Sequence, residues 1–281
     1  MTGGLVRRAG VLLMPAGLLW DWADGAASPQ TPAQSSSERA AQVLADARQA
    51  LGGDKLTSVK TLVATGRTKR VRGDNLVPIE FEITIELPDK YVRKDEVPAE
   101  ESAPTSNGFV GNDLIQIPPP ATPAAGRPGG PPAATPAQLD AQRAARLAGA
   151  KQDFVRLTLG IFASSFSSYP LTFSHAGRAE APQGQADIIE ARGSANFALR
   201  LFLESATHLP LMLSWQAPGA ARGQLAPVEN RLYYADYRHV VGVQLTFRLR
   251  RAVGADTTEE TSIDRWRVNP KIDPRKFDVA K

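Results

Sequence analysis

Hydrophobic and polar residues alternate along three stretches of the chain, and this alternation predicts β-strands with one buried and one solvated face. The clearest stretch is 79–87, where glutamate or threonine separates the apolar positions, and the other two are 197–204 and 243–251. Less regular strands are predicted at 59–71, 90–97, 109–117, 186–190, 209–215, 230–239 and 258–268. We therefore expect about ten strands, mainly antiparallel.

Two other stretches have apolar residues at three- and four-residue spacing, which is typical of amphipathic helices. The first follows Ser36 or Ser37, either of which is a good N-cap, and it stops at the glycines of 52–53. Its predicted buried face consists of Ala40, Val43, Leu44, Ala47 and Leu51. The second covers 137–162 and predicts one long helix or two short ones, with Gly149 and Gly160 as weak points.

The composition indicates one loosely structured insertion and excludes several kinds of chemistry. Residues 118–136 are mainly Pro, Ala and Gly, so we expect a disordered loop there. The chain has no cysteine, which excludes disulfides, thiolate catalysis, zinc–cysteine sites and iron–sulfur clusters. The net charge of +4 comes without a dense basic run interleaved with aromatics, so no nucleic-acid partner is expected.

The beginning of the chain has the order of a secretory signal peptide. Arg7 and Arg8 precede an apolar run at 11–20, and small residues follow at 25–28. Ten helical residues span about 15 Å, half of the hydrocarbon thickness of a bilayer. We predict a signal peptide at 1–28, cleaved near Ala27 or Ser28, then a flexible lead at 29–36. The mature protein is expected to be soluble and periplasmic, and to carry no lipid anchor.

Candidate catalytic groups are sparse. His175, His208 and His239 are far apart and lack a His or Glu partner at metal-ligand spacing. The serines at 164–168 lack the glycines of a nucleophile elbow, and the glutamates at 96–101 are typical of a solvated loop. We therefore expect no enzyme activity, no metal and no cofactor.

Several short segments resemble one family. They are 50–56 (ALGGDKL), 59–62 (VKTL) with Gly66, 85–91 (IELPDKY), 234–238 (YADYR), 241–243 (VGV) and 268–273 (VNPKID) with Phe277. Together they resemble the periplasmic lipoprotein carriers and receptors of the LolA/LolB type. The resemblance implies a mainly β, α+β fold over 37–281: a single unclosed antiparallel β-barrel of about ten strands, with an N-terminal helix and lid-like helices inserted midway. A closed sandwich is the alternative from the strand pattern alone.

The resemblance also implies a concave apolar face that holds acyl chains. Its candidate residues are Ile79, Phe81, Ile83, Ile85, Leu157, Ile161, Phe197, Leu199, Leu201, Leu203, Val243, Leu245, Phe247 and Leu249. The functional arginine of such carriers matches Arg67, Arg70 or Arg72, and no motif chooses among them. The expected function is non-catalytic binding or carriage of acyl lipid or lipidated protein by a monomer, with an inner- or outer-membrane protein as a further partner. The alternatives are an envelope sensor or scaffold module and an envelope hydrolase.

Overall fold

A computed structural model describes residues 35–98, 103–120, 134–181, 184–218 and 226–278. The predicted signal peptide and almost all of the flexible lead lie outside these residues, as does most of the Pro/Ala/Gly loop. None of the helices in the described part combines the length and the apolar character that crossing a membrane requires.

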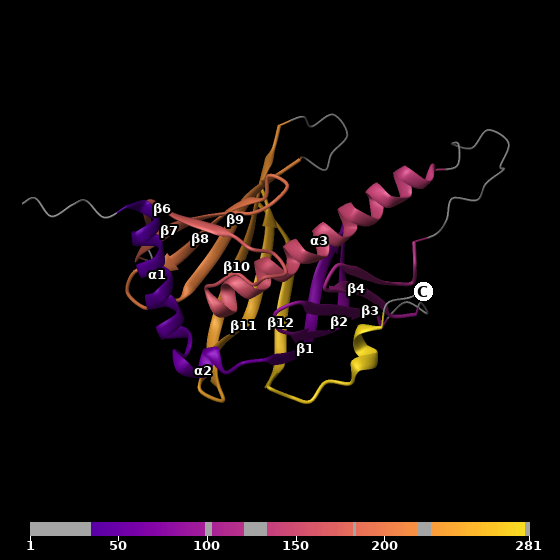
Figure 1. Cartoon of the computed structure of the whole chain (residues 1–281), viewed down its shortest axis with the longest axis horizontal. Helices are drawn as coiled ribbons and strands as arrows, with labels where there is room; N and C mark the ends of the chain where they lie inside the picture. Colours follow the sequence, from indigo (N-terminus) through magenta and orange to yellow (C-terminus); the bar gives the residue numbers. More distant parts are fainter. Residues whose placement is uncertain (1–34, 99–102, 121–133, 182–183, 219–225, 279–281) are drawn as a thin grey trace, which may run out of the picture. The chain divides into compact units, whose positions relative to one another are not determined.

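Twelve strands form one antiparallel sheet that does not close, as the sequence predicted (Figure 1). Their order across the sheet is β5-β4-β3-β2-β1-β12-β11-β10-β9-β8-β7-β6. The strands are β1 (Thr61–Arg72), β2 (Asn75–Glu86), β3 (Lys90–Glu96), β4 (Thr105–Val110), β5 (Asp113–Ile117), β6 (Thr172–Ala181), β7 (Gly184–Arg192), β8 (Ala198–Glu204), β9 (Pro210–Ala217), β10 (Val228–Val240), β11 (Val243–Val253) and β12 (Asp256–Val268). The first strand of the chain thus pairs with the last.

The two strands beyond the predicted ten have physical explanations. The stretch predicted as one strand at 109–117 is a hairpin, because Gly111 turns the chain at positive φ between β4 and β5. The preceding residues Thr105 to Gly108, outside the predicted strand, also belong to β4. Strand β6 was missed because its residues are mostly small or polar and a bulge at 175–177 interrupts the alternation.

The midway insertion is one helix, α3 (Pro136–Phe162). Thr135 and Gln138 form a capping box at its start, with Pro136 in the first turn. Gly160 does not interrupt it. A Cβ added there would overlap the Tyr234 ring, so the glycine allows β10 to approach the helix closely. The prediction of weak points at Gly149 and Gly160 was wrong.

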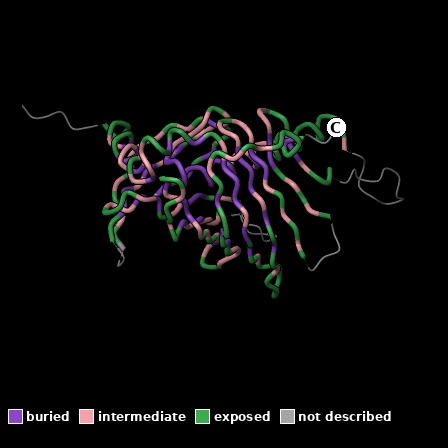
Figure 2. The backbone as a smooth tube through the Cα atoms, turned by 90° about the horizontal axis from the view of Figure 1, so that it is seen from below, coloured by how far each residue is buried: buried purple, intermediate pink, exposed green. Residues whose placement is uncertain are grey.

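Helices α1 (Ser36–Leu51) and α3 lie on the same face of the sheet (Figure 1). The five predicted apolar positions of α1 are buried, and its N-cap is Ser35, one residue earlier than predicted. The short α2 (Asp54–Thr57) and a 3-10 turn at Pro274–Phe277 complete the described elements. The main core joins both long helices to the inner sides of the strands, and buried backbone runs through the middle of the sheet (Figure 2).

Two tyrosines fix α3 to the sheet through its backbone. The hydroxyl of Tyr234 donates to the carbonyl of Arg156, and the hydroxyl of Tyr237 donates to the carbonyl of Gly160 at 2.9 Å. Burial raises the pKa of both phenols, which therefore stay neutral donors. These bonds set the position of the helix residues that face the sheet.

Candidate binding cavity

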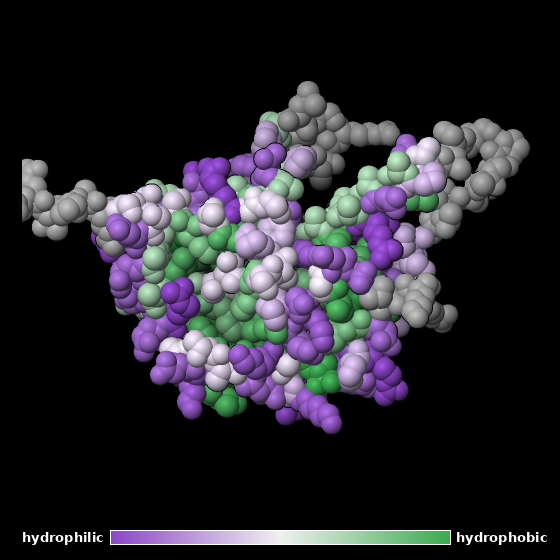
Figure 3. All heavy atoms as spheres, viewed as in Figure 1, coloured by the Kyte–Doolittle hydropathy of each residue, from purple (hydrophilic) through white to green (hydrophobic). Residues whose placement is uncertain are grey.

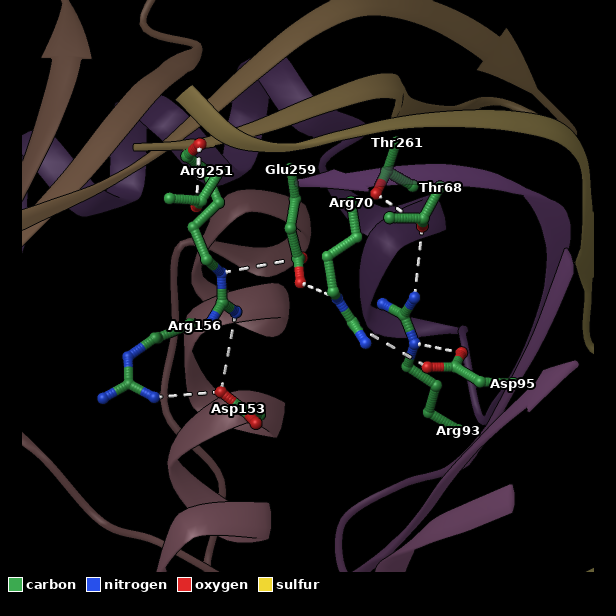
Figure 4. Close-up of polar contacts among 10 residues, drawn as sticks. Thr68, Arg70, Arg93, Asp95, Asp153, Arg156, Arg251, Glu259 and Thr261 are labelled. Carbon is green, nitrogen blue, oxygen red and sulfur yellow. Dashed lines mark hydrogen bonds and ion pairs between the residues drawn. The ribbon is translucent and has the colours of Figure 1, made fainter. Parts of the chain in front are cut away.

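A cavity of about 600 Å³ lies between α3 and the inner face of the sheet. We call it the charged cavity because seven charged side chains, four positive and three negative, line it. They are Arg70 of β1, Arg93 and Asp95 of β3, Asp153 and Arg156 of α3, Arg251 of β11 and Glu259 of β12. Figure 4 shows them converging from α3 and from strands β1, β3, β11 and β12.

Arg70 lies at the centre of this arrangement. Its Nε donates to Glu259 Oε1 at 2.5 Å, and its guanidinium is 3.9 Å from Asp95 Oδ2. The first contact follows from strand register, because Arg70 and Glu259 are direct partners across β1 and β12. One arginine thus joins two carboxylates that come from opposite sides of its strand.

Arg93 is held by a carboxylate and by a threonine hydroxyl. Its Nε donates to Asp95 Oδ1 at 2.6 Å and its guanidinium donates to Thr68 Oγ1 at 3.1 Å. That hydroxyl is 2.8 Å from Thr261 Oγ1, and both threonines are buried. Burial alone would lower the pKa of Arg93, but the charge and hydrogen bond of Asp95 together with the nearby Tyr91 and Glu259 outweigh it and raise the pKa overall. Arg93 is therefore a permanent, oriented cation.

The helix contributes a second, less satisfied group of charges. Asp153 accepts a hydrogen bond from Arg156 at 3.0 Å and lies 3.7 Å from Arg251, which is 4.0 Å from Glu259. The Arg156 guanidinium lies 4.5 Å from the centre of the Trp215 ring, and its buried Nε has no hydrogen-bond partner among the described residues. Burial lowers the pKa of Arg156.

The cavity has a net positive charge, and part of its wall is apolar. Four guanidinium groups face three carboxylates, so one cation lacks a matching charge. Arginine forks match carboxylate and phosphate oxygens, and a partly desolvated site strengthens that attraction. The apolar walls include Ile83, Leu157, Leu232 and Leu249. This combination suits a molecule with an anionic head and an apolar body.

The carboxylates Asp95 and Glu259 converge on Arg70, and each is ion-paired with it. His175 lies outside the charged cavity, 2.9 Å from Asp187, and His208 and His239 are exposed. The described residues contain no group of three potential metal ligands.

Most of the fourteen predicted apolar residues lie in the packed interior. Twelve are buried, while Phe247 and Leu249 are partly buried against the main core. Ile83, Leu157 and Leu249 line the charged cavity. Of the three candidate arginines, Arg70 lies in the cavity, whereas Arg67 is exposed and pairs with Asp264 at 3.5 Å, and Arg72 is exposed near the end of β1.

Hydrophobic side chains also remain visible at the surface beside the helices. Figure 3 shows them gathered in the hollow between α1 and α3, on the face that both helices cover. Several partly buried hydrophobic residues that pack against the main core, such as Phe173, Leu209 and Val240, extend the apolar interior toward solvent. The inner face is therefore packed but not fully sealed.

Apart from Arg70, the charged residues of the cavity were missed in the sequence because their partners are distant. Arg70 and Glu259 are 189 positions apart, and no motif surrounds either. The one signal available was the presence of arginine and glutamate at positions that the strand alternation assigns to an inward face. Residues such as Arg251 follow a run of apolar inward positions in β11.

No protein-family model matches the chain, and no curated protein matches it in sequence. Solved structures similar to it include a DUF1329 family protein from Desulfovibrio piger (8% identity, 87% of this chain and 98% of that one, TM-score 0.48). Another is a putative outer membrane lipoprotein-sorting protein domain from Vibrio parahaemolyticus, at 12% identity over 85% of this chain and 97% of that one, with a TM-score of 0.49. A LolA superfamily protein from Nitrosomonas europaea is similar at 11% identity over 85% of this chain and 97% of that one, with a TM-score of 0.49. Two of these three descriptions name the type of protein that the sequence segments resemble.

Proposed function

We propose that this chain is a non-catalytic, periplasmic binder or carrier of an amphiphile with an anionic head, such as an acyl lipid or a lipidated protein. The observation that carries the proposal is the charged cavity. There, three of the predicted apolar residues, Ile83, Leu157 and Leu249, meet four arginines beneath one helix.

The size and energetics of the cavity support this function. A volume of about 600 Å³ falls within the ~300–1,000 Å³ of small-molecule sites. Burying an acyl chain contributes about 0.8 kcal/mol per CH₂ group, so shape and apolar area suffice for affinity. The arginines then select the head group and fix its orientation.

The arrangement of α3 suggests how the apolar part of a ligand is accommodated. Asp153 of α3 reaches Arg251 of β11 across the cavity at 3.7 Å. An anionic head that binds Arg251 competes with Asp153 and weakens this contact. Leu157 of the same helix lines the cavity, so an acyl chain bound beside Arg251 would contact it there.

A fluorescence titration with a dansyl-labelled fatty acid and its methyl ester tests the proposal. We expect saturable binding of the acid, weakened about tenfold by Arg251→Gln, with little change for the ester. Arg67→Gln is the matched control, because that arginine is exposed and does not line the charged cavity. Equal affinities of wild type and Arg251→Gln for the acid would contradict the proposed role of the cavity.

A second candidate function is a sensor or scaffold module of the envelope. It is favoured by the burial of twelve predicted ligand-binding residues, of which two, Ile83 and Leu157, line the charged cavity while the others pack in the interior. Such a module would hold a membrane-protein ectodomain stably. Retention of a membrane protein in a pull-down, together with no uptake of the labelled fatty acid, would favour it over the carrier.

A further inference from the structure

A groove of about 650 Å³ lies on the outer face of the sheet, opposite to α1 and α3. We call it the outer groove. Its apolar wall includes Phe202 of β8, Met212 of β9 and Tyr233 of β10. These three are direct neighbours across the strands, since Phe202 pairs with Met212 and Met212 pairs with Tyr233.

The side of the sheet follows from alternation along these strands. Leu201, Leu213 and Leu232, each next to one of the three groove residues, belong to the main core with the helices. Phe202, Met212 and Tyr233 therefore point the other way. All three are only half-buried. An outer face that meets only water is normally polar, so a continuous apolar row there requires an explanation.

Two arginines of β11 complete the groove. Arg250 is the cross-strand partner of Tyr233, and its guanidinium lies 4.2 Å from the centre of that ring. Among the described residues, neither Arg248 nor Arg250 has a side-chain hydrogen bond or ion pair. The carboxylate of Asp236 is bound by Arg238 at 2.5 Å, and the charge of Arg248 makes a smaller contribution to lowering the pKa of Asp236.

Acidic residues occupy other positions along the groove. Glu204 accepts a hydrogen bond from Thr207 at 2.5 Å, and Glu260 is the cross-strand partner of Arg250 on β12. The groove thus contains two arginines, and Glu260 lies opposite Arg250 on the next strand as a competing charge. Arg250 lies over the Tyr233 ring, and a guanidinium fork is the group that binds carboxylate, sulfonate and phosphate oxygens in pairs.

We infer that the outer groove is a second binding site, for a small amphipathic organic anion with a flat or chain-like apolar body. The body lies against Phe202, Met212 and Tyr233, and the carboxylate, sulfonate or phosphate binds Arg248 and Arg250. This site is separate from the charged cavity and does not depend on the proposed carrier function.

A pair of dyes with a common body tests the inference. Anilinonaphthalene sulfonate carries an anion, and N-phenyl-1-naphthylamine is the same framework without it. In fluorescence titrations, Arg248→Gln with Arg250→Gln should weaken sulfonate binding about tenfold and change binding of the neutral dye less than about twofold. Glu260→Gln should tighten sulfonate binding severalfold, because the competing carboxylate charge is gone.

Two further variants locate the dyes. Met212→Glu should weaken both, with circular dichroism checking that the chain is folded. Arg70→Gln, which removes an arginine of the charged cavity, should leave unchanged the part of the sulfonate binding that Arg248→Gln with Arg250→Gln abolishes. The substitutions at Arg248, Arg250 and Glu260 still decide the question if Met212→Glu does not fold. Loss of that part of the binding in Arg70→Gln, or no change in the Arg248→Gln, Arg250→Gln chain, would overturn this inference. Either result would leave the proposed function of the charged cavity standing.

Discussion

Arg70 and Glu259 face each other across β1 and β12, with 2.5 Å between Nε and Oε1, although 189 positions separate them in the chain. Their side chains are 31% and 19% exposed, so the pair is neither fully hydrated nor fully buried. It joins the first and last strands of the sheet and also forms part of the cavity wall. Removing one partner should therefore affect both stability and binding.

Glu259→Gln should lower the free energy of unfolding by about 1–2 kcal/mol, between the values for exposed and buried pairs. Urea unfolding monitored by circular dichroism measures this change. Glu80→Gln is the control, because Glu80 is exposed on β2, and its variant should be within about 0.5 kcal/mol of wild type. Equal stability of the two variants would contradict a structural role for the pair.

The same Glu259→Gln substitution should strengthen binding of an anionic amphiphile severalfold. It removes a carboxylate that competes with the ligand for Arg70 and raises the positive charge of the cavity. Titration with the dansyl-labelled fatty acid measures the effect, with the methyl ester as the uncharged reference. A variant that is both less stable and weaker in binding the acid would argue against an anion site at Arg70.

Gly160→Ala should destabilise the protein by about 1–3 kcal/mol, because the added methyl group would overlap the Tyr234 ring. Gly149→Ala in the same helix is the matched control. A methyl group at Gly149 would meet no atom within 4 Å, so higher helix propensity should stabilise the protein by about 0.5–1 kcal/mol. Thermal and urea unfolding of the two variants should therefore shift in opposite directions. Similar shifts in both would contradict the close packing of α3 on β10.

Asp187 should make the stability depend on pH in the acid range. Burial acts to raise its pKa, but hydrogen bonds from His175 and Arg178 and the charge of Arg39 lower it overall. Because the pKa of Asp187 is lower in the folded state, its carboxylate stabilises the fold fully above the unfolded-state pKa of about 3.9. This stabilisation is lost as the pH falls through the pKa that Asp187 has in the folded state. The stability gap between wild type and Asp187→Asn should thus be largest near neutrality and narrow below about pH 4. A gap that stays constant from pH 6 to pH 3 would refute this.

The sequence predicted those parts of the fold that depend on local pattern. In β2, the apolar residues from Ile79 to Ile85 alternate with Glu80, Glu82 and Thr84, because one face meets the core and the other is largely polar. The buried stripe of α1 was visible for the same reason. Strand β6 was not visible, since its small and polar residues and its bulge hide the two-residue period.

The charged cavity depends on contacts that no local pattern encodes. Arg70, Asp153 and Glu259 come from a strand near the start, the midway helix and the last strand. Each one read alone is an ordinary solvated charge. Their convergence follows from the pairing of β1 with β12 and from the position of α3, which Gly160 and Tyr234 determine. Only the three-dimensional arrangement turns them into a candidate site.

Native mass spectrometry of the protein, purified without detergent from a bacterial periplasm, tests the central claim most directly. We predict that wild type and Arg67→Gln retain acyl lipid, seen as a discrete added mass that collisional activation releases. The chain with both Arg70→Gln and Arg251→Gln should lose most of that lipid while remaining folded. Bare wild-type protein in the spectrum, together with no uptake of labelled fatty acid, would contradict an amphiphile-binding role for the charged cavity.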